Sequence, residues 1–162
     1  MPTIYILIGP PASGKSTWRE AYRAKIAEPT VVLSTDDLIE DYAAKNGINY
    51  TEAFGLIDFS ELEKKMFSNM RDAFSNSHNV IVDRTNMSMK SRRRFLSNVP
   101  KNYNKIAVVF DIEPSLLFQR LNKRAEETGK NIPEKNVLTM IQNYQEPTLE
   151  EFDSIIIEKQ ES

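Results

Sequence analysis

The segment that most constrains this chain is Gly9–Ser16 (GPPASGKS), which fits the pattern G-x-x-x-x-G-K-[ST] directly after an apolar run, Thr3–Ile8. In a loop of this kind between a strand and a helix, successive backbone N–H groups point at a phosphate, and the helix N-terminus adds its positive end. Two glycines allow the backbone to approach the anion closely. Lys15 supplies a cation for the β- and γ-phosphates, and Ser16 supplies a hydroxyl for Mg²⁺.

The motif therefore predicts a nucleotide-phosphate site, in preference to a Gly/Pro turn with a chance lysine. Its expected binding residues are Gly9, Pro11, Ala12, Ser13, Gly14, Lys15, Ser16 and Thr17.

The apolar runs predict an α/β fold. Besides Thr3–Ile8, short β-branched runs stand at 31–33, 80–82, 106–110 and 155–157. They are continuous rather than alternating, which is typical of parallel strands buried on both faces. Helical patterns lie between them, including one that Ser60 and Glu63 would open as a capping box. We expect a central parallel sheet of about five strands flanked by helices, the P-loop kinase fold, with ligands at the carboxyl ends of the strands.

Composition narrows the class of protein further. With 162 residues, no recognisable repeat or linker, and 40% apolar residues, we expect a single domain over 1–162. The absence of cysteine excludes a disulfide scaffold, a Cys-ligated zinc site and a Cys nucleophile. No apolar run approaches the roughly 18 residues of a membrane span, and no signal-peptide pattern opens the chain. We therefore expect a cytoplasmic protein with no membrane partner, in the host cell if the gene belongs to a phage.

The second strand is followed by Ser34-Thr35-Asp36-Asp37. These residues suit a helix start, with a hydroxyl cap and two acids in the first turn. They equally suit a carboxylate opposite the phosphate loop that takes a proton from an attacking hydroxyl. Spacing alone leaves both interpretations open.

The third strand is followed by Asp83-Arg84-Thr85-Asn86. Asp83 at a strand end resembles the carboxylate that holds Mg²⁺, directly or through water, in P-loop enzymes; a structural cap is the alternative. Seven basic residues and no acidic one lie between Arg84 and Phe110. The net charge of −2 divides into −4 for 1–83, +8 for 84–125 and −6 for 126–162. The near-neutral total thus hides a basic block, which is either a solvated face or a path for an anionic acceptor.

The fourth strand precedes a helix that carries Arg120 and Arg124 on one face. A polar stretch with a glycine follows at 125–131, and we expect it to form a mobile lid. Arginines on such a lid would neutralise charge on a transferred phosphoryl group; as ordinary surface residues they would contribute little.

Together these motifs resemble the polynucleotide 5′-hydroxyl kinases, both the phage type and the kinase half of the animal polynucleotide kinase/3′-phosphatase. The resemblance rests on the phosphate loop through Trp18, on Asp36 after strand two, and on the sequences at 83–86, 91–94 and 144–152. It implies the P-loop kinase fold, ATP as phosphate donor, Mg²⁺ as cofactor, and roles for individual residues. Asp36 would be the catalytic base, Lys15, Arg120 and Arg124 would act on the phosphates, and the acceptor would contact Asp36, Asp83, Arg84, Thr85, Asn86 and Arg92.

The chain departs from this family at several positions. Ala12 replaces a usual glycine, which is tolerable where the backbone dihedrals are ordinary. Thr35 and Ile39 stand where arginines are common, which puts acceptor contacts there in question, and Arg84 replaces an aspartate of the phage form. No phosphatase motif accompanies the kinase motifs.

We therefore expect an enzyme, a phosphotransferase that phosphorylates the 5′-hydroxyl end of RNA or DNA in nucleic-acid repair. A ligase and a separate 3′-end-healing enzyme are the partners that the resemblance implies. A P-loop kinase for a small-molecule hydroxyl (a nucleoside, sugar acid or antibiotic) shares every nucleotide-side residue and stays open. A non-catalytic nucleotide switch is the third alternative.

Overall fold

The computed structural model describes residues 1–161 and contains one parallel sheet with strand order β2-β3-β1-β4-β5. Its strands are β1 (Thr3–Ile8), β2 (Thr30–Leu33), β3 (Asn79–Val82), β4 (Asn104–Asp111) and β5 (Ser154–Lys159). Each strand contains an expected apolar run, and all but β1 extend beyond it by one or two residues at one end or both. The expected α/β fold is thus confirmed.

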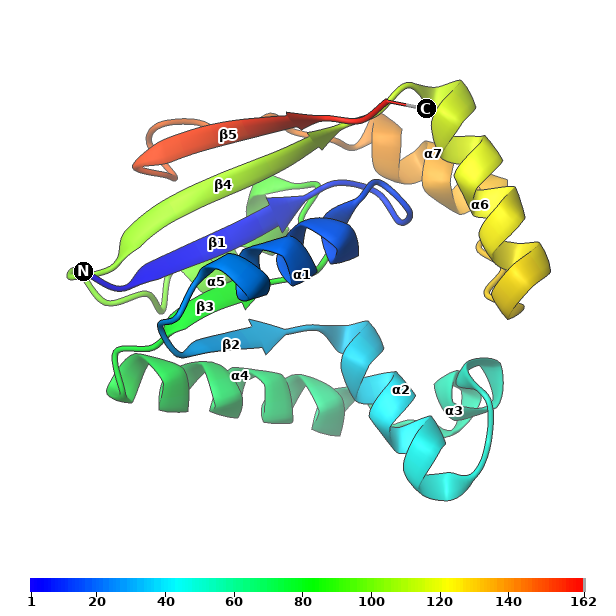
Figure 1. Cartoon of the computed structure of the whole chain (residues 1–162), viewed down its shortest axis with the longest axis horizontal. Helices are drawn as coiled ribbons and strands as arrows, with labels where there is room; N and C mark the ends of the chain where they lie inside the picture. Colours follow the sequence, from blue (N-terminus) through cyan, green and yellow to red (C-terminus); the bar gives the residue numbers. More distant parts are fainter. Residues whose placement is uncertain (162) are drawn as a thin grey trace.

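Seven helices complete the described chain: α1 (Lys15–Lys25), α2 (Thr35–Asn46), α3 (Tyr50–Leu56), α4 (Phe59–Ser75), α5 (Met89–Leu96), α6 (Pro114–Thr128) and α7 (Glu134–Gln142). Figure 1 shows α1 in front of the sheet and α5 behind it. The expected capping box at Ser60 is wrong. The N-cap is Asp58, two residues earlier, and its side chain accepts hydrogen bonds from the backbone N–H groups of Ser60 and Glu61.

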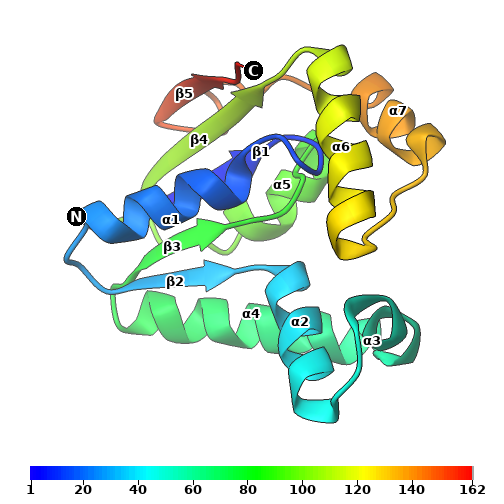
Figure 2. The same cartoon turned by 45° about the vertical axis from the view of Figure 1, so that its right-hand side comes forward.

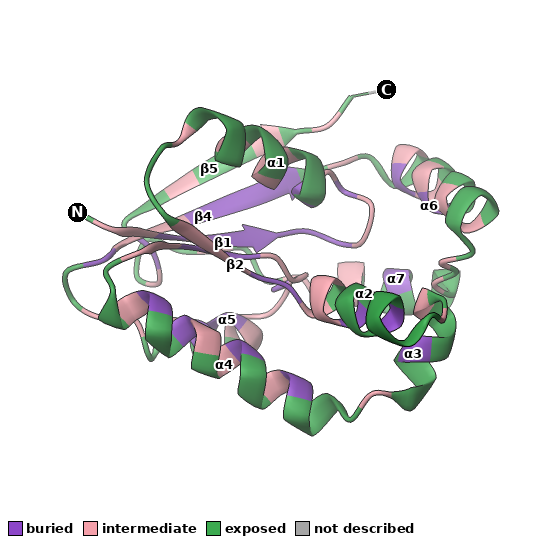
Figure 3. Ribbon diagram, turned by 60° about the horizontal axis from the view of Figure 1, so that its bottom comes forward, coloured by how far each residue is buried: buried purple, intermediate pink, exposed green. Residues whose placement is uncertain are grey.

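Alternate residues of the buried strands face opposite sides, so the sheet has a core on each face. On one face, Ile4, Ile6 and Ile8 pack with Met66 and Met70 of α4 and with Phe95 of α5, among others. On the other face, Leu7, Ile81 and Val108 pack with Trp18 and Tyr22 of α1. Trp18 is therefore a packing residue, stacked on Tyr22 at 5.3 Å between ring centres. In Figure 3 the buried strands lie between these two helical layers.

Two smaller clusters lie beyond the carboxyl ends of the strands. One joins α2, α3 and α4 through Ile39, Ala43, Ala53 and Leu62. The other joins α6 and α7 through Leu117, Leu121 and Val137, with Ala12 of the phosphate loop against it. Figure 2 shows the helices of both clusters at the same end of the sheet, with the loop after β1 beside α6. Among residues 1–161 no helix combines the length and apolar character needed to cross a membrane.

Candidate active site

A cleft of about 1180 Å³ opens at the carboxyl ends of the strands, where parallel α/β sheets bind ligands. The phosphate loop and the start of α1 form its base. One wall comes from α2 and α3, and the other from α6 and the segment 130–136. Most of the predicted site residues line it: Pro11, Ala12, Gly14, Lys15, Ser16, Thr17, Asp36, Asp83, Arg84, Thr85, Arg120 and Arg124.

The phosphate loop depends on its glycines for two different reasons. At Gly9 a Cβ would lie 2.5 Å from Oγ of Ser13, a side chain that is fully buried beneath the loop. Gly14 adopts a φ of 104°, in the left-handed range. Ala12 adopts a φ of 65°, so its dihedrals are not ordinary: this position keeps a conformation that favours glycine although the glycine is gone.

Lys15 is buried beneath the cleft and donates hydrogen bonds from Nζ to the carbonyl oxygens of Gly9 (2.6 Å) and Pro10 (3.0 Å). Burial lowers its pKa to about 8, although the nearby carboxylates of Asp83 and Asp36 raise it. The ammonium is thus held by loop carbonyls and by surrounding charge rather than by a direct ion pair. A bound phosphate would stabilise its charged form further.

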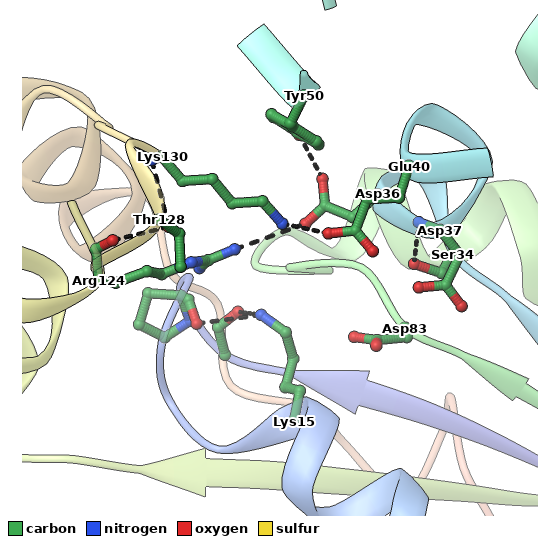
Figure 4. A network of polar contacts seen from close by, with 12 residues as sticks. Lys15, Ser34, Asp36, Asp37, Glu40, Tyr50, Asp83, Arg124, Thr128 and Lys130 are labelled. Atoms are coloured by element: carbon green, nitrogen blue, oxygen red, sulfur yellow. Dashed lines mark hydrogen bonds and ion pairs between the residues drawn. The ribbon is translucent and has the colours of Figure 1, made fainter. Parts of the chain in front are cut away.

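Asp36 is the second residue of α2 and faces the phosphate loop from the wall that α2 and α3 form. Its Oδ1 accepts a hydrogen bond from the hydroxyl of Tyr50 at 2.6 Å, and its Oδ2 lies 4.0 Å from Nη2 of Arg124 (Figure 4). The helix is capped by Ser34, whose hydroxyl accepts from the N–H of Asp37. Because Ser34 caps the helix, the Asp36 carboxylate is available to the cleft.

Arg19 organises the two carboxylates that lie beside Asp36. One guanidinium nitrogen donates to Asp83 Oδ2 at 2.8 Å, and another donates to Asp37 Oδ1 at 2.9 Å. Burial raises the pKa of Asp83, while the charges of Lys15 and Arg19 oppose that shift. Sequence reasoning missed Arg19, although it stands four residues after Lys15 and therefore on the same face of α1.

The opposite wall of the cleft carries the two predicted arginines. Arg120 donates from Nη1 to the carbonyl of Ala12 (3.4 Å) and to Oε1 of Gln160 (3.2 Å), so it lies against the phosphate loop. Arg124 instead approaches Asp36 across the cleft. The pair thus contacts the phosphate loop and the candidate base, respectively.

The expected lid at 125–131 is only partly a loop, because α6 continues to Thr128 and ends at Gly129, which has a φ of 73°. Beyond it, Lys130 reaches across to α2 and pairs with Glu40, and its Nζ lies 4.4 Å from the centre of the Tyr50 ring (Figure 4). Together with the Arg124–Asp36 pair, these contacts span the mouth of the cleft. No local pattern singles out Tyr50 in the sequence.

Two predicted acceptor contacts are wrong, because neither side chain reaches the cleft. Arg92 has no exposed surface, and its guanidinium bonds to Glu151 (2.9 and 3.3 Å) and to the carbonyl of Asn86 (2.9 Å). Asn86, which is 2% exposed, donates its side-chain amide to the carbonyl of Leu7 at the end of β1. Both residues instead support the start of the phosphate loop, where the N–H of Gly9 also bonds to the carbonyl of Thr85.

Three of the seven basic residues between Arg84 and Phe110 form ion pairs in the folded chain. Glu63 of α4 pairs with Arg84 (3.0 Å) and with Arg94 (2.6 Å), and Glu151 holds Arg92. Of the seven basic residues between Arg84 and Phe110, only Arg84 lines the cleft. The basic residues of α5 therefore do not line the cleft, and the structure does not support the predicted path for an anionic acceptor along this helix.

Ser16 and Asp83 line the same cleft and offer oxygen atoms, the donors that Mg²⁺ prefers. Among the described residues no three His, Asp or Glu side chains gather in a metal-binding group. This donor set suits Mg²⁺, which keeps several waters and binds through one or two protein oxygens together with substrate phosphates.

Residues 4–147 match the family described as "AAA domain". The chain belongs to this family. As an AAA domain protein it is 29% identical, over 147 residues, to the L-seryl-tRNA(Sec) kinase of Methanococcus maripaludis. That alignment covers 89% of this chain and 53% of the relative, so the chain spans about half the relative's length.

Solved structures with similar folds include several kinases. A chain of the Pnkp1/Rnl/Hen1 RNA repair complex is 26% identical with a TM-score of 0.68, over 88% of this AAA domain chain and 43% of that one. A putative kinase from Chloroflexus aurantiacus (15% identity, TM-score 0.70) covers 98% of this chain and 85% of its own. A gluconokinase from Sinorhizobium meliloti (17% identity, TM-score 0.58) covers 98% and 82%. The latter two show the P-loop kinase fold alone.

Proposed function

We propose that this protein is an ATP- and Mg²⁺-dependent kinase that transfers the γ-phosphate of ATP to the 5′-hydroxyl end of RNA or DNA. The observation that carries the proposal is the position of Asp36, a carboxylate that faces the phosphate loop across the cleft and pairs with Arg124. A nucleotide switch needs no such carboxylate.

In this reaction the acceptor oxygen attacks the γ-phosphorus, its proton passes to the Asp36 carboxylate, and the bond to the β-phosphate oxygen breaks. The products are a 5′-phosphate monoester and ADP. Lys15 binds the β- and γ-phosphates, and Arg120 and Arg124 contact the transferred group as charge develops on it. Mg²⁺, when bound through Ser16 and Asp83, neutralises phosphate charge. Arg19 holds Asp83 in position.

Similarity to proteins whose names refer to RNA supports a nucleic-acid acceptor. The seryl-tRNA kinase is 29% identical to this chain, and the chain of the RNA repair complex is 26% identical. The ion pairs of Arg84, Arg92 and Arg94 support the second candidate, a kinase for a small-molecule hydroxyl, because they leave fewer free cations for a phosphate backbone. A ligase and a separate 3′-end-healing enzyme remain the partners that the first proposal implies.

Transfer of label from [γ-³²P]ATP to 5′-hydroxyl RNA, 5′-hydroxyl DNA and free nucleosides separates these candidates. The slope of log affinity against log salt is about −0.7 for each single-strand phosphate contacted, and close to zero for a neutral small acceptor. Transfer to nucleosides alone would replace the first proposal with the second.

The base assignment is tested by Asp36→Asn. General-base catalysis contributes about 10²–10⁴-fold, so we expect a fall in kcat of that size with ATP affinity retained. Asp37→Asn is the matched control: Asp37 lies next to Asp36 on α2 but bonds to Arg19, and we expect a much smaller fall. Near-normal turnover by Asp36→Asn would refute the assignment.

A further inference from the structure

Three exposed apolar side chains stand on α3, the helix whose Tyr50 bonds to Asp36, and at the start of α4. Phe54, Leu56 and Phe59 are 51%, 66% and 40% exposed although they stand within six residues of one another. Of these three, only Phe54 lines the cleft. Single exposed apolar residues are common on proteins, but an exposed aromatic ring that lines a cleft is a feature that binding sites share.

The packing of α3 does not require Phe54. The helix is anchored through Ala53, which is fully buried against Ile39, Ala43 and Leu62. Phe54 instead contacts two other rings. Its centre lies 6.2 Å from that of Tyr50 and 5.1 Å from that of Phe59, which meets it edge-on at 66°. These neighbours hold the Phe54 ring in place while half of its surface remains open.

Tyr50 links this ring to the reacting groups. Its hydroxyl donates to Asp36, and the Lys130 ammonium lies against its ring, so both the hydroxyl and the ring of Tyr50 already have a partner within the chain. Burial and the hydrogen bond to Asp36 raise the pKa of Tyr50 well above its usual value, which keeps the hydroxyl a donor. Phe54 is thus an aromatic ring of the cleft with half of its surface open, one helical turn from Tyr50.

We infer that Phe54, held by Tyr50 and Phe59, is a platform on which the base of the acceptor's 5′-terminal nucleotide stacks. The inference rests on the proposed function: C5′ and the sugar ring join a 5′-hydroxyl to its base, and the Phe54 ring centre lies 6.2 Å from that of Tyr50, whose hydroxyl bonds to Asp36. Aromatic stacking is sequence-tolerant, because every base has a flat π-face. The site thus recognises a base without distinguishing which base it is.

The test uses two 5′-hydroxyl oligonucleotides that differ only at the first residue, which carries either a base or an abasic tetrahydrofuran sugar. For Phe54→Ala we expect KM for the base-bearing acceptor to rise roughly tenfold, within the range measured for stacking contacts, with kcat little changed. KM for the abasic acceptor should stay at the wild-type value of that acceptor. Phe54→Trp should retain the preference for a base.

Leu56→Ala is the matched control, because Leu56 is exposed on the same helix and does not line the cleft. It should leave both KM values unchanged. Phe54→Leu keeps an apolar side chain against Phe59 but lacks a flat face, so a KM effect equal to that of Phe54→Ala supports stacking rather than a folding defect. Thermal unfolding of each variant checks that the fold is kept.

Equal KM increases on both acceptors, or no increase on either, would overturn the platform while leaving the kinase proposal standing. Absence of wild-type transfer to any 5′-hydroxyl oligonucleotide would overturn the proposed function and the platform together. If Phe54→Ala lost binding to a protein partner and kept both KM values, the ring would belong to a protein interface.

Discussion

Replacing Arg92 with methionine removes a guanidinium that has no exposed surface and keeps much of the side-chain volume. The lost contacts are two bonds to Glu151 and one to the Asn86 carbonyl. Breaking a buried ion pair by removing one partner costs about 3–5 kcal/mol. Glu151 is 12% exposed and also accepts from the N–H of Thr148, so water can partly replace the arginine and the lower end of that range, about 3 kcal/mol, applies.

A domain of this size loses about 2–4 °C in Tm for each kcal/mol, so we expect Tm to fall by about 6–12 °C. Calorimetry and urea unfolding measure the change. Arg93→Met is the control, because Arg93 is exposed on the same helix and should change the free energy of unfolding by less than about 0.5 kcal/mol.

A double-mutant cycle with Glu151→Gln isolates the pair. If Arg92 stabilises the chain through Glu151, the two changes should be strongly non-additive. The KM for acceptor at 20 °C should stay near normal, since the side chain does not reach the cleft. An unchanged Tm combined with a raised acceptor KM would refute this reasoning and return Arg92 to the substrate site.

Two further predictions concern the phosphate loop. Because burial lowers the pKa of Lys15 from 10.5 to about 8, the unfolded chain keeps a proton there that the folded chain has lost at higher pH. Between pH 8 and 10.5 the free energy of unfolding of the wild type should therefore rise by about 3 kcal/mol relative to that of Lys15→Met. Urea unfolding at several pH values measures both, and the same pH dependence in the two proteins would contradict this prediction. At Ala12 the left-handed backbone offsets the usual cost of introducing glycine, so Ala12→Gly should cost about 1–2 kcal/mol less than Ala44→Gly on the exposed face of α2. Equal losses on urea unfolding would count against a strained Ala12.

The strands and the phosphate loop were predictable because their signals are local. The sheet order brings the ends of β1, β2 and β3 together, and this is why Asp36 and Asp83 share one cleft as expected. The roles of Arg92 and Asn86 were not predictable in the same way. A run of basic residues has the same sequence pattern whether its side chains contact water or a distant glutamate. Glu151, which pairs with Arg92, lies 59 residues further along the chain.

Arg19 and Tyr50 show two different reasons for missing a site residue. The spacing of Arg19 from Lys15 is visible in the sequence, but its two aspartate partners come from separate elements. Tyr50 reaches Asp36 only because α3 folds back against α2 through Ala53, and that packing is set by tertiary contacts. Local patterns thus predict the residues of the phosphate loop better than the residues that surround Asp36.

The ion pairs across the mouth of the cleft couple its two walls only weakly. Asp36 and Glu40 are each about half exposed, at 54% and 51%. Exposed ion pairs contribute about 0–1 kcal/mol each, so Arg124–Asp36 and Lys130–Glu40 together hold the two walls against each other by less than about 2 kcal/mol. Because salt screens both pairs, we expect the coupling between the walls to weaken as ionic strength rises.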